Sequence, residues 1–286
     1  MILCHTIAEL RALIAERRKT DGGKVAFVPT MGNLHSGHIQ LIHEARNVGN
    51  IVVCSIFVNP MQFGPNEDLD SYPRTLSADS EQLTEAGCDI LFAPSANEIY
   101  PNGLQSHSQV DVPELGDELC GAARPGHFTG VTTVVSKLFN IVQPDIALFG
   151  QKDFQQLAVI RKMAQDLCMP LEIIGVPTVR GESGLALSSR NGYLTQDELS
   201  KAPALYQTLV KIRQSIESGE TDFDKLCQQG KADLETAGFT PDYLSVRRQS
   251  DLKSALPSDQ ELVILAAAHL GKARLIDNIA FALNHK

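Results

Sequence analysis

Short apolar runs alternate with longer amphipathic stretches from residue 24 onward. Such alternation is typical of βα units arranged around a parallel sheet. The apolar runs predict strands at Val25–Val28, Ile51–Val58, Asp89–Ala93, Ile146–Phe149 and Leu171–Val176. Apolar residues three or four positions apart predict helices over about 38–48, 77–86, 129–142 and 153–168. We therefore expect an α/β fold with a Rossmann-like, doubly wound parallel sheet.

The pattern changes after Val176. Amphipathic stretches predict two helices, over about 196–217 and 222–237. They precede three short strand-like segments near Tyr243–Arg247, Glu261–His269 and Arg274–Asn278. Helices followed by strands indicate a smaller C-terminal α+β domain, so we expect two domains, at residues 1–178 and 179–286. A cleft between two domains is the usual place for a ligand.

Two long segments, Pro60–Arg74 and Tyr100–His127, are rich in Pro, Gly, Asn and Asp. We expect them to be loops or elaborations at the carboxyl edge of the sheet. Ligands of doubly wound sheets usually bind at that edge, so polar residues that follow strands are the candidates for chemistry.

Composition argues against several classes of protein. The 286 residues are 43% hydrophobic and 21% charged, which is typical of globular chains. The net charge of −9 argues against nucleic acid as a partner.

No apolar run reaches the roughly 18 residues of a membrane span, and the N-terminus lacks a signal-peptide pattern, so we expect a cytoplasmic protein with no membrane partner. The six cysteines form no CxxC pair, which argues against disulfides or a thiolate zinc site.

The strongest candidate site is the string from Pro29 to His38, which runs from the first predicted strand into the first predicted helix. A helix N-terminus carries free N–H groups and partial positive charge, and Gly32 and Gly37 let a phosphate approach the backbone. His35 and His38 can face the same anion. They can also serve only to cap the helix, which is the commoner role of a lone HxxH pair. A metal site is less favoured, because no nearby acidic residue completes a tetrahedral set.

The string His35-Ser36-Gly37-His38 resembles the HxGH motif of the nucleotidyltransferase superfamily, which is shared with class I aminoacyl-tRNA synthetases. Four more strings follow in order: SIFVNPMQF at 55–63, GHF at 126–128, FGQKDFQQ at 149–156 and LSSRN at 187–191. Together the five strings resemble the pantoate–β-alanine ligase family over essentially the whole chain. One such motif is weak, whereas five in the same order are specific.

The resemblance implies an AMP-forming ligase of pantothenate and coenzyme A biosynthesis that uses ATP with Mg²⁺. The carboxylate of (R)-pantoate would attack the α-phosphorus of ATP, giving pantoyl adenylate and pyrophosphate. The amine of β-alanine would then displace AMP and form the amide bond of pantothenate, with no protein nucleophile. The resemblance also implies a homodimer.

The same resemblance implies which residues contact ATP. They are Met31, Gly32, Asn33, Leu34, His35, Ser36, Gly37, His38, Gly150, Gln151, Lys152, Asp153, Val179, Leu187, Ser188, Ser189 and Arg190. The residues expected to stabilise charge on the phosphates are His35, His38, Lys152, Ser188, Ser189 and Arg190. Among these we favour His38 as the catalytic residue, because the second histidine of the motif is expected to lie closest to the helix N-terminus.

Two glutamines are the candidates for the acid site. By the resemblance, Gln62 and Gln156 would hold pantoate, and Gln62 would also help to receive β-alanine. Independently, the segment from Asn59 to Phe63 combines polar amides with apolar side chains at the end of a strand, which suits a small polar acid. Standing alone, Gln62 is equally well explained as a polar turn residue.

Two segments near the second domain differ in how strongly they indicate function. Lys152 follows a strand beside Gly150, which favours phosphate contact over a solvated position. The segment Ser188–Arg190 is equally compatible with a polar interdomain turn. Position 151 is Gln where the family commonly has Glu, so a role for that carboxylate does not transfer, and Leu187 replaces a Met of similar volume.

Four further polar residues have structural interpretations beside functional ones. Arg124 and His127 can line the mouth of the site, but we expect them to be structural. Asp79 and Gln82 can approach a magnesium ion or lie on an exposed helix face. Asp153 can bond a ribose hydroxyl or cap a helix.

Other functions compete with the ligase. Another nucleotidyltransferase of this kind would leave a nucleotide on its product, and a nucleotide-sensing module would bind ATP without turnover. Gln62 and Gln156, as acid-site residues, argue against the sensing module. A fragment of a tRNA synthetase is less favoured, because the acidic chain offers no basic surface for tRNA.

Overall fold

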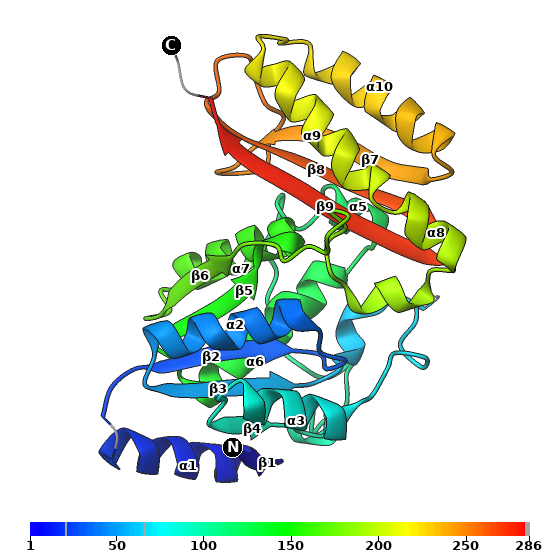
Figure 1. Ribbon diagram of the computed structural model, residues 1–286. Helices are drawn as coiled ribbons and strands as arrows, with labels where there is room; N and C mark the ends of the chain where they lie inside the picture. The colour runs from blue at the N-terminus through cyan, green and yellow to red at the C-terminus, as the bar shows by residue number, and fades with distance from the viewer. Residues whose placement is uncertain (21, 66, 284–286) are drawn as a thin grey trace. The chain divides into compact units, whose positions relative to one another are not determined.

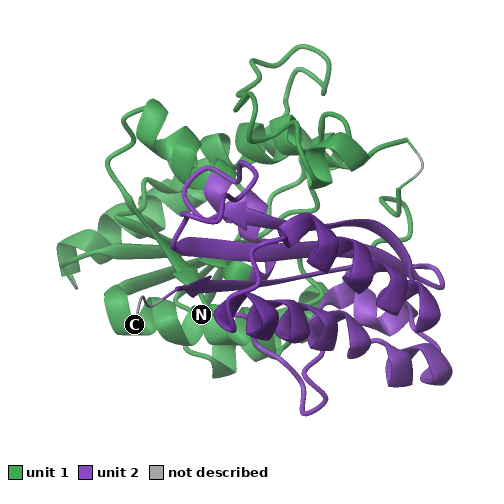
Figure 2. Cartoon of the chain, turned by 90° about the horizontal axis from the view of Figure 1, so that it is seen from above, with its two compact units in different colours: residues 1–151, 159–177 green, residues 152–158, 178–286 purple. Residues whose placement is uncertain are grey.

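The computed structural model describes residues 1–20, 22–65 and 67–283 (Figure 1). The chain divides into two compact units. The first consists of Met1–Gln151 and Val159–Pro177, and the second of Lys152–Ala158 and Thr178–Lys286 (Figure 2). Each unit has a sheet of its own.

Six parallel strands form the sheet of the first unit. In chain order they are β1 (Ile2–Cys4), β2 (Val25–Thr30), β3 (Ile51–Ile56), β4 (Ile90–Phe92), β5 (Ile146–Gly150) and β6 (Glu172–Val176). Their order across the sheet is β1-β4-β3-β2-β5-β6. The order reverses at β2, because β3 pairs with one side of it and β5 with the other. Doubly wound sheets bind their ligands at the carboxyl edge beside such a switch point.

Helices cover both faces of this sheet. Ala26 and Val28 of β2 belong to a core cluster with α2 and α3, whereas the intervening Phe27 contacts Phe139 of α6, with ring centroids 6.5 Å apart. Burial on both faces explains why the strands are continuous apolar runs. The helices in this part of the chain are α1 (Ile7–Thr20), α2 (Ser36–Val48), α3 (Leu76–Glu85), α4 (Ala96–Ile99), α5 (Cys120–Ala123), α6 (His127–Val142) and α7 (Phe154–Asp166), with short 3-10 turns η1 (Pro60–Gln62) and η2 (Gln151–Asp153).

The second unit contains a three-stranded antiparallel sheet in the order β7-β8-β9. Its helices α9 and α10 pack against β7, β8 and β9 around a core that includes Leu209, Leu234 and Ile264. The elements are η3 (Ser189–Tyr193), α8 (Gln196–Lys201), α9 (Ala204–Glu217), α10 (Phe223–Thr236), β7 (Thr240–Arg248), β8 (Glu261–Leu270) and β9 (Ala273–Ala282).

The predicted fold class is confirmed: the structure has a Rossmann-like parallel sheet and a smaller unit of helices with an antiparallel sheet. The elements before residue 24 were not predicted, because β1 is three residues long and α1 buries only Leu10 and Ile14. The single helix predicted over 196–217 is two helices. Pro203, which has no N–H to donate, precedes the second of them.

Five of the six cysteines are buried, and Cys168 is exposed. Burial raises the pKa of the Cys4 thiol to about 11 and that of the Cys88 thiol to about 12. Within the described residues, no helix has the length and apolar character that a membrane crossing requires.

Candidate active site

The turn after β2 carries the first candidate residues. Gly32 (φ 82°) and Asn33 (φ 51°) both adopt left-handed backbone conformations, which reverse the chain before α2 begins. A Cβ atom on Gly32 would lie 3.0 Å from Ile56 Cγ2, so the turn also needs glycine for space. Thr30 Oγ1 donates to the Ser55 carbonyl (2.8 Å) and accepts from the Gly32 N–H (3.3 Å), which ties the turn to β3.

The carboxylate of Asp79, on α3, holds this turn in place. Its side chain is buried, with 1% of the residue exposed. Oδ2 accepts from the Asn33 N–H (2.9 Å) and from Thr75 Oγ1 (3.1 Å), and Oδ1 accepts from the Leu34 N–H (2.9 Å). Of the two interpretations left open for Asp79, the exposed helix face is therefore wrong. The backbone of residues 33 and 34 is thus fixed by the Asp79 carboxylate, which accepts from both N–H groups.

His35 and His38 form an unusual capping box at the start of α2. His35 is the N-cap residue, and its Nδ1 accepts from the Gly37 N–H (3.1 Å). His38 Nδ1 accepts from the His35 N–H (3.3 Å), and the two rings lie 4.1 Å apart between centroids. Because a neutral imidazole that accepts at one nitrogen carries its proton on the other, we assign both rings as Nε2–H tautomers.

Capping and anion binding are therefore compatible roles for these histidines. The caps use Nδ1, so each ring has Nε2–H as its donor, at a helix N-terminus whose partial charge favours an anion. One reason for preferring His38 was wrong, however. His35 is the N-cap and lies closer to the helix start, whereas His38 is the third residue of the helix.

The side chain of Gln62 is oriented by a buried asparagine. Asn59 is 1% exposed, and its Nδ2 donates to Gln62 Oε1 (3.1 Å) and to the Gly130 carbonyl (3.1 Å). Its Oδ1 accepts from the Tyr100 hydroxyl (2.8 Å). This arrangement leaves Gln62 Nε2 directed at the sulfur of Met31, 3.1 Å away. Gln62 is therefore held against the residue that precedes the Gly32–Asn33 turn.

The backbone of Gln62 is held by a second cluster. Arg124 donates to both carboxylate oxygens of Glu67 (2.7 and 2.5 Å) and to the Gln62 carbonyl (3.3 Å). Arg124 also contacts His127 Nε2 (2.9 Å), so His127 Nδ1 is the nitrogen that donates to the Gln62 carbonyl (2.8 Å). Arg124 and His127 thus have structural contacts around Gln62.

The side chain of Gln151, where the resemblance led us to expect Glu, bonds to the sheet. Gln151 follows Gly150 at the end of β5, and its Nε2 donates to the Gly175 carbonyl of β6 (3.3 Å). An amide can donate to a carbonyl and a carboxylate cannot, so this contact depends on the Glu-to-Gln difference.

In the second unit, residues 179–187 form a small hairpin. The Leu187 N–H donates to the Val179 carbonyl (3.0 Å), and Arg180 pairs with Ala186 as an antiparallel bridge. Ser188 then caps η3, its Oγ accepting from the Arg190 N–H (3.2 Å). The hairpin therefore links the two predicted ATP segments of this unit, at 179 and 187–190.

The other predicted residues of this unit lie on η2, α7 and η3. The Lys152 side chain is 19% exposed and its Nζ lies 4.0 Å from Asp153 Oδ2. Gln156 is half-buried on α7, while its neighbour Gln155 is buried. The Ser189 and Arg190 side chains are half-buried within η3.

The described residues offer no ready-made metal site. Apart from positions 21, 66 and 284–286, no group of three His, Cys, Asp or Glu side chains gathers as metal ligands. Asp79 was a candidate ligand of magnesium, but its carboxylate oxygens already accept hydrogen bonds from two backbone N–H groups and a hydroxyl. The residues present therefore do not fit a protein-bound magnesium cage.

A Rossmann-like sheet whose switch-point strand runs into an HxGH-capped helix defines an α/β protein of the nucleotide-binding class. Comparison with known families narrows this class. The model of the family described as pantoate-beta-alanine ligase matches residues 2–280, and the chain belongs to that family.

Relatives match along the whole chain. The pantothenate synthetase of Azotobacter vinelandii is 59% identical over 280 residues, which cover 98% of this chain and 99% of that protein. The crystal structure of pantothenate synthetase from Thermus thermophilus has a TM-score of 0.90 at 45% identity, covering 98% and 99% of the two chains. A ligase from Francisella tularensis, solved with beta-gamma ATP and beta-alanine, has a TM-score of 0.79 at 34% identity, covering 98% and 97%.

Asp79→Asn should destabilise the protein by about 1–3 kcal/mol, because an amide offers only one acceptor and its NH₂ group would face a backbone N–H. Denaturant unfolding measures this loss. Asp70→Asn is the matched control, because Asp70 is exposed, and should change the free energy of unfolding by less than about 0.5 kcal/mol. Equal effects of the two variants would contradict the role assigned to Asp79.

Glu67→Gln should remove part of the acid sensitivity of the fold. Burial alone would raise the pKa of Glu67, but the hydrogen bonds and charge of Arg124 outweigh it and lower the pKa below its usual 4.5. The ionised carboxylate therefore stabilises the fold above the unfolded-state pKa, and this stabilisation is lost as pH falls through the folded-state pKa.

The measurement is the free energy of unfolding of the wild type and Glu67→Gln between about pH 7 and pH 3. The wild type should be more stable at neutral pH, and the difference should shrink on acidification. Arg124→Gln should reduce the pH dependence in the same way. A difference that stays constant over this range would show that the ion pair does not lower the pKa.

Proposed function

We propose that this chain joins (R)-pantoate to β-alanine at the expense of ATP, forming pantothenate, AMP and pyrophosphate. The observation that carries the proposal is the contact between Gln62 Nε2 and Met31 Sδ, 3.1 Å apart. In this contact a neutral amide, which suits a small hydroxy acid, lies directly beside the HxGH turn, which suits a nucleotide. Adjacent acid and nucleotide sites are what attack of a carboxylate on ATP requires.

The first step would be attack of a pantoate carboxylate oxygen on the α-phosphorus of ATP. The new bond joins the carboxylate to AMP, and pyrophosphate leaves with the electron pair of the broken P–O bond. The Nε2–H groups of His35 and His38 would donate to phosphate oxygens as negative charge builds up on them. We assign His38 the catalytic role, and His35 supports it through the shared cap.

The second step would be attack of the neutral amine of β-alanine on the carbonyl carbon of pantoyl adenylate. The amine loses a proton, the C–N bond forms, and AMP leaves with the electron pair of the C–O bond. Gln62, whose carbonyl side is occupied by Asn59, would offer its NH₂ group to the substrates. The chain needs no nucleophile of its own for either step.

Residues of the second unit complete the proposal. Main-chain groups at Val179 and Leu187 would hold the adenine side of ATP, and Gln156 would hold pantoate. Lys152 and the segment Ser188–Arg190 would neutralise the leaving pyrophosphate, because they combine two cations with hydroxyl donors. The Gln151 side chain donates to a carbonyl of β6, so we propose that only the backbone of this residue contacts ATP.

Two parts of the proposal, the Mg²⁺ ion and the homodimer, rest on the resemblance. Mg²⁺ would arrive on the phosphates of ATP, since magnesium is commonly bound through substrate phosphates with few protein ligands. The homodimer and the cytoplasmic location stay predictions.

Pantoate alone should support exchange of labelled pyrophosphate into ATP, because formation of the adenylate is reversible and precedes the use of β-alanine. The assay follows label in ATP with pantoate present and β-alanine absent. Other small hydroxy acids serve as controls and should give little exchange. Exchange that requires β-alanine would refute the two-step order, and a product that retains the nucleotide would favour a nucleotidyltransferase instead.

His38→Ala should lower turnover by about 10²-fold or more, the usual effect of removing one preorganised donor to a developing charge. ATP affinity should change less. His43→Ala is the control, because His43 is an exposed histidine on the same helix and should leave turnover unchanged. Near-normal turnover of a folded His38→Ala enzyme would assign His38 to capping alone.

A further inference from the structure

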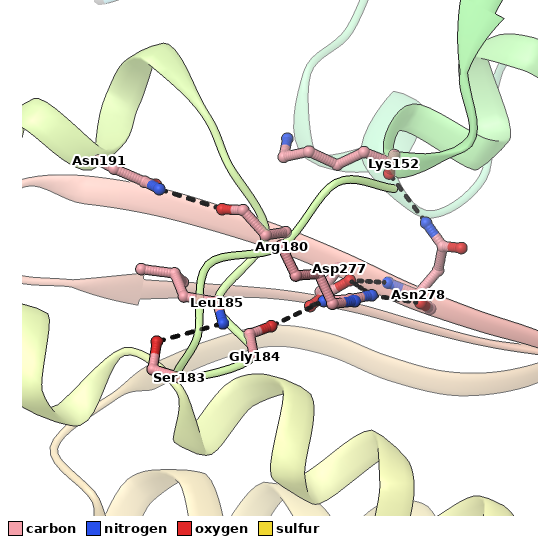
Figure 3. A network of polar contacts seen from close by, with 9 residues as sticks. Lys152, Arg180, Ser183, Gly184, Leu185, Asn191, Asp277 and Asn278 are labelled. Atoms are coloured by element: carbon pink, nitrogen blue, oxygen red, sulfur yellow. Dashed lines mark hydrogen bonds and ion pairs between the residues drawn. The ribbon is translucent and has the colours of Figure 1, made fainter. Parts of the chain in front are cut away.

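A largely buried ion pair joins the hairpin of residues 179–187 to β9. Arg180, in the hairpin, donates to both carboxylate oxygens of Asp277 on β9, at 2.6 and 2.8 Å (Figure 3). Their side chains are 18% and 3% exposed. A buried, bidentate pair of this kind has fixed geometry, unlike the exposed ion pairs of the surface.

The guanidinium of Arg180 joins three parts of the second unit. Besides Asp277, it donates to the Gly184 carbonyl at the hairpin tip (3.1 Å) and to the Asn278 carbonyl of β9 (3.3 Å). It also stacks on the Tyr206 ring of α9, 3.7 Å from the centroid. Gly184 itself has φ 88°, and a Cβ there would lie 2.9 Å from that ring. The hairpin therefore rests on α9 and β9 at several points.

The network continues to Lys152, which belongs to another predicted ATP segment. Asp277 Oδ1 also accepts from the Asn278 N–H (2.7 Å), and Asn278 Nδ2 donates to the Lys152 carbonyl (2.9 Å). Figure 3 shows the chain of contacts from Gly184 through Arg180, Asp277 and Asn278 to Lys152. Two segments far apart in sequence are thus fixed to one strand.

We propose that Arg180, Asp277 and Asn278 are positioning residues that set the hairpin 179–187 and the Lys152 backbone in the geometry that binds ATP. The proposal rests on the proposed function in that it takes these two segments as the nucleotide-binding parts of the second unit. None of the three side chains need touch the substrate. Their effect passes through backbone groups that they hold.

The decisive variant is the double substitution Arg180→Gln with Asp277→Asn. Either single substitution would leave a buried charge without its partner, whereas removing both charges avoids that cost. We expect an unfolding midpoint closer to that of the wild type than either single variant gives. The amides of residues 179–187 should exchange hydrogen at least about 10-fold faster, because the hairpin has lost its anchor.

The functional readout is calorimetric titration of ATP with Mg²⁺, without pantoate, so that no turnover occurs. The double variant should bind ATP at least about 10-fold more weakly and bind pantoate normally. Arg248→Gln with Asp251→Asn is the matched control, because this Arg–Asp pair lies in the same unit but outside the network. The control should change neither ATP affinity nor hydrogen exchange at 179–187.

Asn278→Leu tests the second arm with the ion pair intact. It should weaken ATP binding while leaving hydrogen exchange at 179–187 near the wild-type rate, and it decides the question if the double variant does not fold. Unchanged ATP affinity in Asn278→Leu and in a folded double variant overturns the proposal. So does unchanged hydrogen exchange in the double variant, because the hairpin would then be held by other means.

The outcomes separate this inference from the proposed function. A wild type that binds ATP but shows no pantoate-dependent pyrophosphate exchange, with variants that lose ATP binding, refutes the ligase and supports the positioning network. A wild type that exchanges pyrophosphate, with variants that bind ATP normally, supports the ligase and overturns the network.

Discussion

The placement of β2 between two parallel neighbours is the constraint on which the first unit depends. Pairing with β3 on one side and β5 on the other makes the ends of all three strands meet at one edge of the sheet. The HxGH turn, η1 with Gln62, and Gly150 follow these three strands, so their adjacency comes from strand pairing rather than from loop contacts.

Much of this arrangement could be predicted from the sequence, because buried parallel strands are continuous apolar runs and the candidate motifs follow them. The motif strings also place His38 and Gln62 at strand ends without any coordinates. Boundaries were less predictable. The break at Pro203 and the weakly buried helix α1 were missed because helical periodicity alone does not register a missing N–H or a small buried face.

The side chains that hold the site could not be predicted, because their partners are distant in sequence. Asp79 looks like a surface carboxylate on a helix, and only the fold shows that it accepts from Asn33 and Leu34, 46 and 45 residues away. The nitrogen that each histidine uses for its cap is likewise a matter of three-dimensional geometry. A single sequence carries the functional groups in its motifs, but the residues that orient them lie elsewhere along the chain.

The Arg180–Asp277 pair also has a consequence for the order in which the protein is made. The two residues are 97 positions apart, so the ribosome completes the hairpin long before it supplies the carboxylate that anchors it. Through that interval Arg180 has no buried counter-charge, and the hairpin cannot settle into its final form. The first unit's sheet precedes β9 in the chain, so its core can assemble earlier. The second unit can therefore complete its structure only late in synthesis, when β9 has been made.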